Sequence, residues 1–196
     1  DVLDKIYRQI TSFPAPERFL EEARMGLQID TAEDLNHAPW MQAMLDILHK
    51  KAAAAVQLAE RCLAICEEPD GPEQYREQIE SDIEKLQAIG QADSYAAMKG
   101  AIESKWATLS RKKFTGDKEL QEACKTLRKE YKDEFDSKKL DSFKQSEAQI
   151  LEDMQLLKTY LLPLLSLTEE FMTRFMEEKQ KRKMLEFSDI SHMAYQ

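Results

Sequence analysis

Two copies of an Asp-x-x-His motif are the residues of this chain that come nearest to a metal-binding pattern. Asp46-Ile-Leu-His49 and Asp189-Ile-Ser-His192 each place a carboxylate and an imidazole three residues apart, which is one face of a helix. Di-iron bundles use Glu-x-x-His twice, together with one glutamate from each of two further helices. Because the carboxylate here is the shorter Asp both times, we interpret these residues as surface and capping groups and predict no metal site.

Three cysteines are the next candidates for chemistry. Cys62 and Cys66 lie four residues apart on a predicted helix face, but the sequence supplies no clustered second pair to complete a metal site with them. We therefore expect them to be small buried side chains. With Cys124 the count is odd and low, which argues against a disulfide framework and indicates a reducing compartment, so we expect a cytoplasmic protein.

A basic stretch interleaved with aromatic residues is the candidate for binding nucleic acid. The segment 105–116, KWATLSRKKFTG, has four basic residues and no acidic one: Lys105, Arg111, Lys112 and Lys113. Trp106 lies within it, and such a combination can hold phosphates while the ring stacks on a base. The alternative is that Trp106 anchors the loop and the cations are simply solvated. Residue types alone favour that alternative, because charge runs are usually solvated faces.

The charge of the chain is unevenly distributed. The net charge is -9, so bulk electrostatics does not indicate a nucleic-acid binder. Yet residues 99–144 contain 13 Lys and Arg against 9 Asp and Glu, which leaves 15 against 28 for the remainder. Residues 67–84 hold eight acidic residues and a single basic one, Arg76. The chain thus has one basic region and one acidic region.

Motifs of the common nucleotide-binding and hydrolytic enzymes are absent from the sequence. It contains no GxxxxGK[ST] phosphate loop, no DExx pair after an apolar strand, no GxSxG and no HExxH. We therefore expect no catalytic residue and no cofactor in this chain by itself. No apolar run is long enough to cross a bilayer, so we expect no membrane association.

The elements that position these residues are predicted to be helices. Gly and Pro number five and six, and Ala, Leu, Glu, Lys and Gln are abundant, which favours helix. Apolar residues that recur every three or four positions predict helices over 2–10, 16–26, 40–67, 72–90, 94–103, 117–138 and 142–183. Trp40 is expected in the core, residues 31–39 in a loop, and Pro163 at a kink or break. The predicted fold is an all-α, elongated bundle of six to eight helices.

The last part of the chain resembles a known helicase segment. The spacing F-x3-F-x3-K-x2-R-x3-E-F-S-D-I-x-H from Phe171 to His192 is similar to the K-R-x4-D-F-[SN]-D-L-E-H pattern of the AddA (RexA) family of ATP-dependent helicase/nuclease subunits, which are UvrD/PcrA-like superfamily-one helicases. Other stretches agree in order: Phe13 to Leu20, Ala38-Pro39-Trp40, Asp70-Gly71-Pro72 with Tyr75, Arg111-Lys112-Lys113, and Leu127 to Lys132. Glu186 replaces the usual Asp, and Ile190-Ser191 replaces Leu-Glu. The resemblance covers nearly the whole chain.

This resemblance implies a place for the chain within a larger protein. Residues 1–183 correspond to the helical insertion, subdomain 1B, of the first motor domain. Residues 184–196 begin the return into that motor domain (1A), with Phe187, Ser188 and Asp189 in its motif. The parent is implied to use ATP and Mg²⁺, to carry a nuclease domain, to work with an AddB/RexB-type partner subunit, and to process double-strand breaks for recombination.

Residues and resemblance together give the expected function. We expect a DNA-engaging accessory subdomain that is inactive alone, and that faces duplex or forked DNA with Lys105, Trp106, Arg111, Lys112 and Lys113. The alternative is an interaction module in which the acidic helix 72–86 binds the partner subunit. A di-iron enzyme, the third class, predicts bound metal in elemental analysis.

Overall fold

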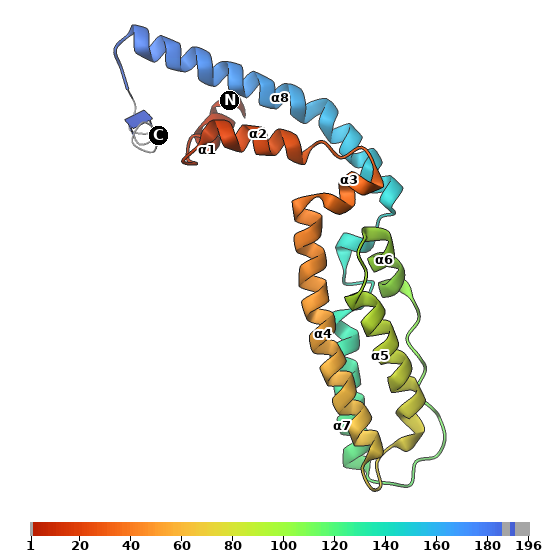
Figure 1. The fold of residues 1–196 in the computed structure, drawn as a ribbon. Helices are drawn as coiled ribbons and strands as arrows, with labels where there is room; N and C mark the ends of the chain where they lie inside the picture. The colour runs from red at the N-terminus through yellow and green to blue at the C-terminus, as the bar shows by residue number, and fades with distance from the viewer. Residues whose placement is uncertain (1, 186–188, 191–196) are drawn as a thin grey trace. The chain divides into compact units, whose positions relative to one another are not determined.

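The computed structural model describes residues 2–185 and 189–190. Within this part the chain forms eight α-helices and two short 3-10 helices, and no strand (Figure 1). The predicted all-α class is therefore confirmed. The chain divides into two compact units, a central unit of residues 35–149 and a terminal unit of residues 1–34 and 150–196.

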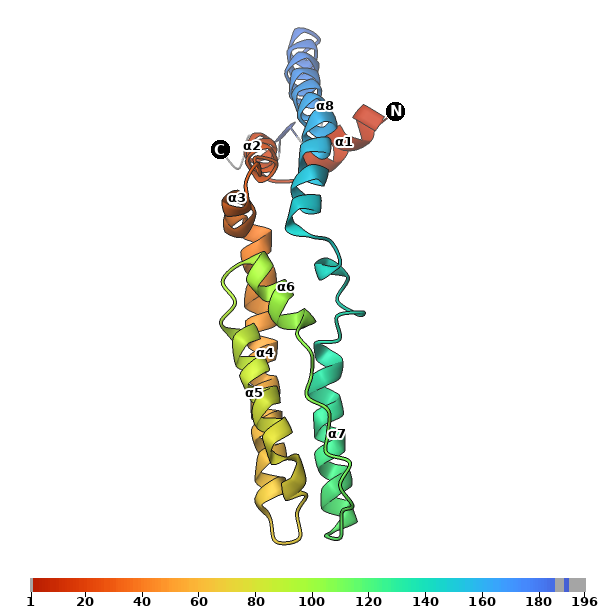
Figure 2. The ribbon, with the colours of Figure 1, turned by 90° about the vertical axis from the view of Figure 1, so that its right-hand side faces the viewer.

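The central unit is built around one long helix. α4 (Pro39–Glu67) packs against α5 (Arg76–Gly90) and α7 (Lys118–Glu134), as Figures 1 and 2 both show. The shorter α6 (Tyr95–Glu103) follows α5, and the 3-10 helices η1 (Glu73–Tyr75) and η2 (Asp141–Phe143) flank α5 and α7 in the chain. The apolar residues that recur along α4 every three or four positions form a buried packing seam: Met41, Leu45, Leu48, Ala52, Ala55, Ala59, Cys62 and Cys66.

The terminal unit joins the two ends of the sequence. It contains α1 (Val2–Ile10), α2 (Pro16–Gly26) and most of α8 (Glu147–Lys181). Tyr7 of α1 meets Phe171 and Phe175 of α8 edge-on, with ring centroids 5.4 Å apart in both pairs. Arg24 of α2 forms an ion pair with Glu169 at 2.6 Å. Aromatic packing and charge thus hold the first helices against α8.

The structure corrects three details of the sequence-based prediction. The expected loop 31–39 contains a short helix, α3 (Ala32–His37). Thr31 and Asp34 form a reciprocal cap at its start, because each side chain accepts a hydrogen bond from the other residue's backbone N–H, at 2.9 and 3.1 Å. Trp40 is not a core residue, since 46% of it is exposed. The predicted break at Pro163 is wrong, because the residue lies inside the continuous helix α8, whereas the alternative of a kink there stays a prediction.

The predicted return segment is described only in part. Phe187 and Ser188 lie outside the described residues. Asp189 is buried, and Lys179 of α8 donates to both of its carboxylate oxygens at 3.0 Å. The Lys179 ammonium group also lies 4.5 Å from the centre of the Phe175 ring. In the described residues, no helix combines the length and hydropathy of a membrane span.

Candidate nucleic-acid interface

The basic stretch forms an extended loop on the central unit. Residues 105–117 connect α6 to α7 without a helix, as predicted. The side chains of Lys105, Arg111, Lys112 and Lys113 are exposed, whereas Trp106 is partly buried. The loop therefore presents its cations to solvent, while its first aromatic residue points back to the protein.

Trp106 fixes the start of this loop. Its ring centroid lies 5.9 Å from that of Tyr131 on α7. The ammonium groups of Lys85 and Lys132 lie 4.5 and 5.5 Å from the ring centre, within reach of cation–π attraction. This packing favours the anchoring interpretation of Trp106, because groups of the same chain already contact the ring.

A buried ion pair lies beneath the loop. Arg128 of α7 donates from Nε and Nη2 to the two carboxylate oxygens of Asp82 on α5, at 2.6 and 3.1 Å. The Tyr131 hydroxyl donates to Asp82 Oδ2 at 2.8 Å, and Arg128 Nη2 also donates to the backbone carbonyl of Ala107 at 2.5 Å. Asp82 and Arg128 are only 1% and 7% exposed. The network thus joins α5, α7 and the loop backbone.

The surroundings of this network favour charged Arg128 and neutral Tyr131. Although desolvation opposes the charge on Arg128, its hydrogen bonds to Asp82 raise the pKa of the guanidinium group above its ordinary value. Desolvation, together with the negative charge of Asp82, raises the pKa of the Tyr131 hydroxyl. This direction favours the neutral hydroxyl, which donates to Asp82.

Lys85 secures the end of α6, where the loop begins. Its ammonium group donates to the carbonyl of Ile102 at 2.8 Å and also to that of Ser104. Carbonyl groups at a helix C-terminus lack partners within the helix, so a lysine is a suitable cap. Burial lowers the pKa of Lys85 to about 8, although the charge of Asp82 acts in the opposite direction.

The far end of the loop is clamped to the turn between α4 and η1. The Asp117 N–H donates to the Asp70 carbonyl at 2.8 Å. A Cβ atom at Gly116 would lie 2.2 Å from that carbonyl oxygen, and one at Gly71 would lie 2.2 Å from the Ile65 carbonyl oxygen. Asp70 itself has a φ of 62°, in the left-handed region. Glycine is thus required at Gly116 by the close approach of the loop to the turn, and at Gly71 by the carbonyl groups at the end of α4.

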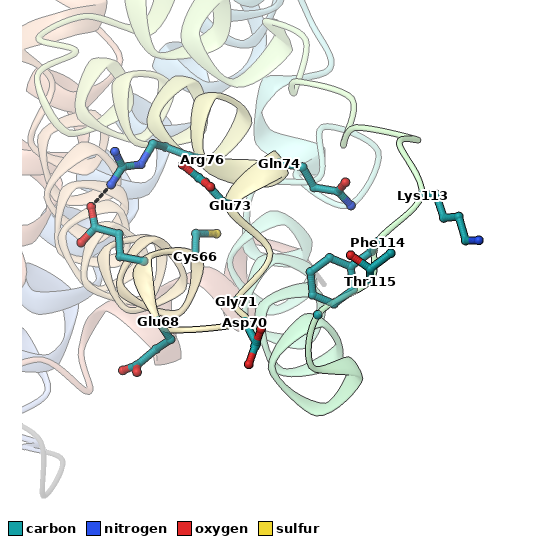
Figure 3. A pocket seen from close by; sticks show the side chains of 12 residues that line it. Cys66, Glu68, Asp70, Gly71, Glu73, Gln74, Arg76, Lys113, Phe114 and Thr115 are labelled. Atoms are coloured by element: carbon teal, nitrogen blue, oxygen red, sulfur yellow. Dashed lines mark hydrogen bonds and ion pairs between the residues drawn. The ribbon is translucent and has the colours of Figure 1, made fainter.

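An open cleft of about 580 Å³ lies between these two segments. Figure 3 shows Lys113 extending away from the acidic side chains on the opposite side. The lining contains Glu67, Glu68, Asp70 and Glu73 against the cations Arg76 and Lys113. Since most of these charges are negative, phosphate would be repelled from the cleft and attracted to the outer side of the loop.

The other sequence candidates are not brought together into a site. His49 Nε2 lies 2.8 Å from the Ala92 carbonyl oxygen, and His192 is outside the described residues. All three cysteines are buried, as predicted for Cys62 and Cys66, and Cys66 Sγ lies 3.9 Å from Cys124 Sγ. Among the residues that the structure describes, no group of three or more His, Cys, Asp and Glu side chains is placed to hold a metal ion.

The residues that hold the loop were missed by sequence reasoning. Asp82, Lys85 and Arg128 are charged, and charged residues are expected on the surface. A signal for two of them was present: Asp82 follows the buried Ile79 by three positions, and Arg128 follows the buried Cys124 by four. A charged residue in register with an apolar stripe suggests a buried pair.

Curated proteins similar to this chain share one description. The chain is 32% identical over 97% of its length to the A subunit of the ATP-dependent helicase/nuclease of Lachnoclostridium phytofermentans, and it covers 14% of that protein. The proteins of the same description from Desulforamulus reducens and Listeria monocytogenes are 24% and 26% identical over 98% of the chain, which covers 16% of each. The chain therefore spans about one-seventh to one-sixth of the length of these relatives. No protein-family model matches it.

Proposed function

Since this chain belongs, as a segment, to the family of ATP-dependent helicase/nuclease A subunits, we propose that it is an accessory DNA-engaging subdomain of such a protein. It corresponds in this proposal to the helical 1B insertion of the first motor domain, and the parent acts in the cytoplasm in double-strand break repair and recombination. The role of the subdomain in this proposal is to hold the DNA by the phosphates while the motor domains move the DNA.

One observation carries the proposal. The loop carries four exposed cations within its acid-free stretch 105–116: Lys105, Arg111, Lys112 and Lys113. Buried polar contacts hold the start of the loop, and a glycine clamp holds its end. Cations on a fixed backbone bind phosphates with a smaller loss of conformational entropy than cations on a mobile loop. Contacts of this kind position DNA without reading its sequence.

ATP and Mg²⁺ do not fit the residues of this chain. The sequence contains no phosphate-loop motif. In the described part of the chain, no group of His, Cys, Asp and Glu side chains is placed to hold a metal ion. We assign nucleotide and metal to the remaining parts of the parent, and the segment alone is proposed to hydrolyse neither ATP nor DNA.

A second candidate function is supported by an acidic row on α5. Glu77, Glu80 and Glu84 are exposed and follow one another at spacings of three and four residues. Such spacing places them on one face of the helix. A partner of the AddB/RexB type with a basic surface could bind this row, while DNA binds the loop.

The test of DNA binding uses the 196-residue chain and a fluorescent forked duplex. The loop variant replaces Lys105, Arg111, Lys112 and Lys113 with Gln, and the binding constant is measured by anisotropy over a series of salt concentrations. If all four cations contact phosphates, the slope of log K against log salt falls by about 3–4, since each contact contributes about 0.9.

The result that contradicts the proposal is an unchanged slope and affinity in the loop variant. A control variant carries Lys50→Gln, Lys51→Gln and Arg61→Gln, which remove exposed cations from α4 of the same unit. Its binding should remain close to that of the unaltered chain. Equal losses in both variants would indicate a response to net charge alone.

A further inference from the structure

A row of lysines on α7 accompanies the basic loop. Lys118, Lys125, Lys129 and Lys132 are separated by seven, four and three residues. At about 100° per residue, these spacings place the four side chains within roughly 60° of one another around the helix axis. Lys118 and Lys129 are exposed, and Lys125 and Lys132 are partly exposed. Lys118 and Lys132 are 14 positions apart, or about 21 Å along the helix.

The row lies on the side of α7 that meets the loop. Lys132 approaches the Trp106 ring, and Arg128 donates to the Ala107 carbonyl, so the first loop residues pass beside this part of α7. At the other end, the loop leads directly into the helix, where the Asp117 side chain accepts from the Glu119 N–H at 2.7 Å. Lys132, at one end of the row, thus lies beside the first loop residues, and Lys118, at the other end, follows directly on the last ones.

Two exposed acidic residues border this side of the helix, Glu122 and Asp133, at about 20° and 40° beyond Lys129 around the helix axis. Glu122 lies at its edge and forms an ion pair with Lys125 at 2.7 Å. The exposed acidic row of α5, described above, belongs to a different helix. A polyanion would therefore be attracted along α7 and repelled along α5, which gives it one preferred side of the central unit.

From this arrangement we infer that Lys118, Lys125 and Lys129 form a second row of phosphate contacts, which extends the DNA surface from the loop along α7. The inference rests on the proposed function, but the proposed function does not require these three residues. Lys118 and Lys129 are 11 positions apart, or about 16.5 Å along the helix. Since successive phosphates of one strand rise by about 3.4 Å, these three lysines can follow roughly five of them. Trp106 is covered by cations of its own chain, so the surface offers charge rather than stacking.

The experiment compares matched charge changes in the 196-residue chain. The α7 variant carries Lys118→Gln, Lys125→Gln and Lys129→Gln, and the α4 control described above loses the same number of charges. Lys132 is left intact because it contacts Trp106. With duplex DNA, the α7 variant should lower the salt slope by about 2–3 and the control by less than about 0.5.

A further variant keeps the test independent of any loss of folding. Glu122→Gln removes the acid that pairs with Lys125 and should tighten duplex binding about twofold, since exposed charge pairs have effects of that order. A purely structural role of the pair predicts unchanged or weaker binding instead.

The outcomes separate this inference from the proposed function. If the loop variant loses binding but the α7 variant matches the α4 control, the row on α7 is refuted and the loop proposal stands. If neither the loop variant nor the α7 variant differs from the unaltered chain, both are refuted. Single-stranded DNA bound as tightly as the duplex, with the same losses, would support the cation row and leave no role for duplex geometry.

Discussion

Asp82→Asn is the substitution that tests most sharply how the loop is held. It removes the charge of a side chain that is 1% exposed and accepts hydrogen bonds from Arg128 and Tyr131. Arg128, itself 7% exposed, would keep its charge without a counter-ion. Removing one partner of a buried pair costs about 3–5 kcal/mol, because the other charge remains desolvated. We expect the free energy of unfolding to fall by about that amount.

The assay is urea unfolding followed by far-ultraviolet circular dichroism and tryptophan fluorescence. A Trp40→Phe background leaves Trp106 as the remaining tryptophan, and its ring lies 5.9 Å from that of Tyr131 beside the altered pair. The comparison is Lys125→Gln, which breaks an ion pair whose side chains are 39% and 68% exposed. That pair should contribute at most about 1 kcal/mol.

A double variant identifies the cause of the loss. Asp82→Leu combined with Arg128→Met removes both charges, and apolar replacement of a buried pair is often neutral or stabilising. The double variant should therefore be more stable than Asp82→Asn. The reasoning is refuted if Asp82→Asn costs no more than Lys125→Gln, or if the double variant is the less stable one.

Three other predictions concern the clamp, the cap and the thiols. Gly116→Ala should lower the free energy of unfolding in urea by about 1–3 kcal/mol, because its Cβ would lie 2.2 Å from the Asp70 carbonyl oxygen. Gly100→Ala should be neutral or stabilising, because the position is helical and nothing lies within 4 Å of the added Cβ. Equal effects of the two substitutions would contradict the clamp. Burial lowers the pKa of Lys85 from 10.5 to about 8, so between pH 8 and 10.5 the unfolded chain binds more protons than the folded one. The free energy of unfolding should therefore rise with pH over this range in the unaltered chain, but not in Lys85→Met. Contact with Cys62 and burial raise the pKa of Cys124 to about 12. At pH 8 its labelling by a disulfide reagent should therefore be slow until urea unfolds the chain. Rapid labelling of the folded chain would contradict the buried position.

Helix periodicity was sufficient to predict most of the fold. The seam of α4 was readable because apolar residues recur every three or four positions, and Gly90 marked the end of α5. α3 was missed because a helix of six residues has too few turns to show a period. Its capping pair, Thr31 and Asp34, was the available signal. Trp40 was misplaced because residue type indicates average burial and not the burial of one side chain.

The sequence indicated the cations of the candidate site, but not the residues that hold the loop in place. The four cations were visible as an acid-free run. The pairing of Asp82 with Arg128 joins positions 46 residues apart, and no local pattern indicates which distant charge a buried residue meets. The α7 lysines were also overlooked, because acidic residues separate them in sequence and only the helix gathers them on one side.

The central claim is that DNA lies against the basic loop of the central unit. It is tested most directly by photo-cross-linking, with a benzophenone side chain placed at Ser110 in the loop and, in a second protein, at Glu80 in the acidic row of α5. Duplex DNA should be cross-linked from position 110 and not from position 80, and the yield should fall as salt screens the phosphate contacts. Cross-linking from position 80 with none from position 110 would contradict the account.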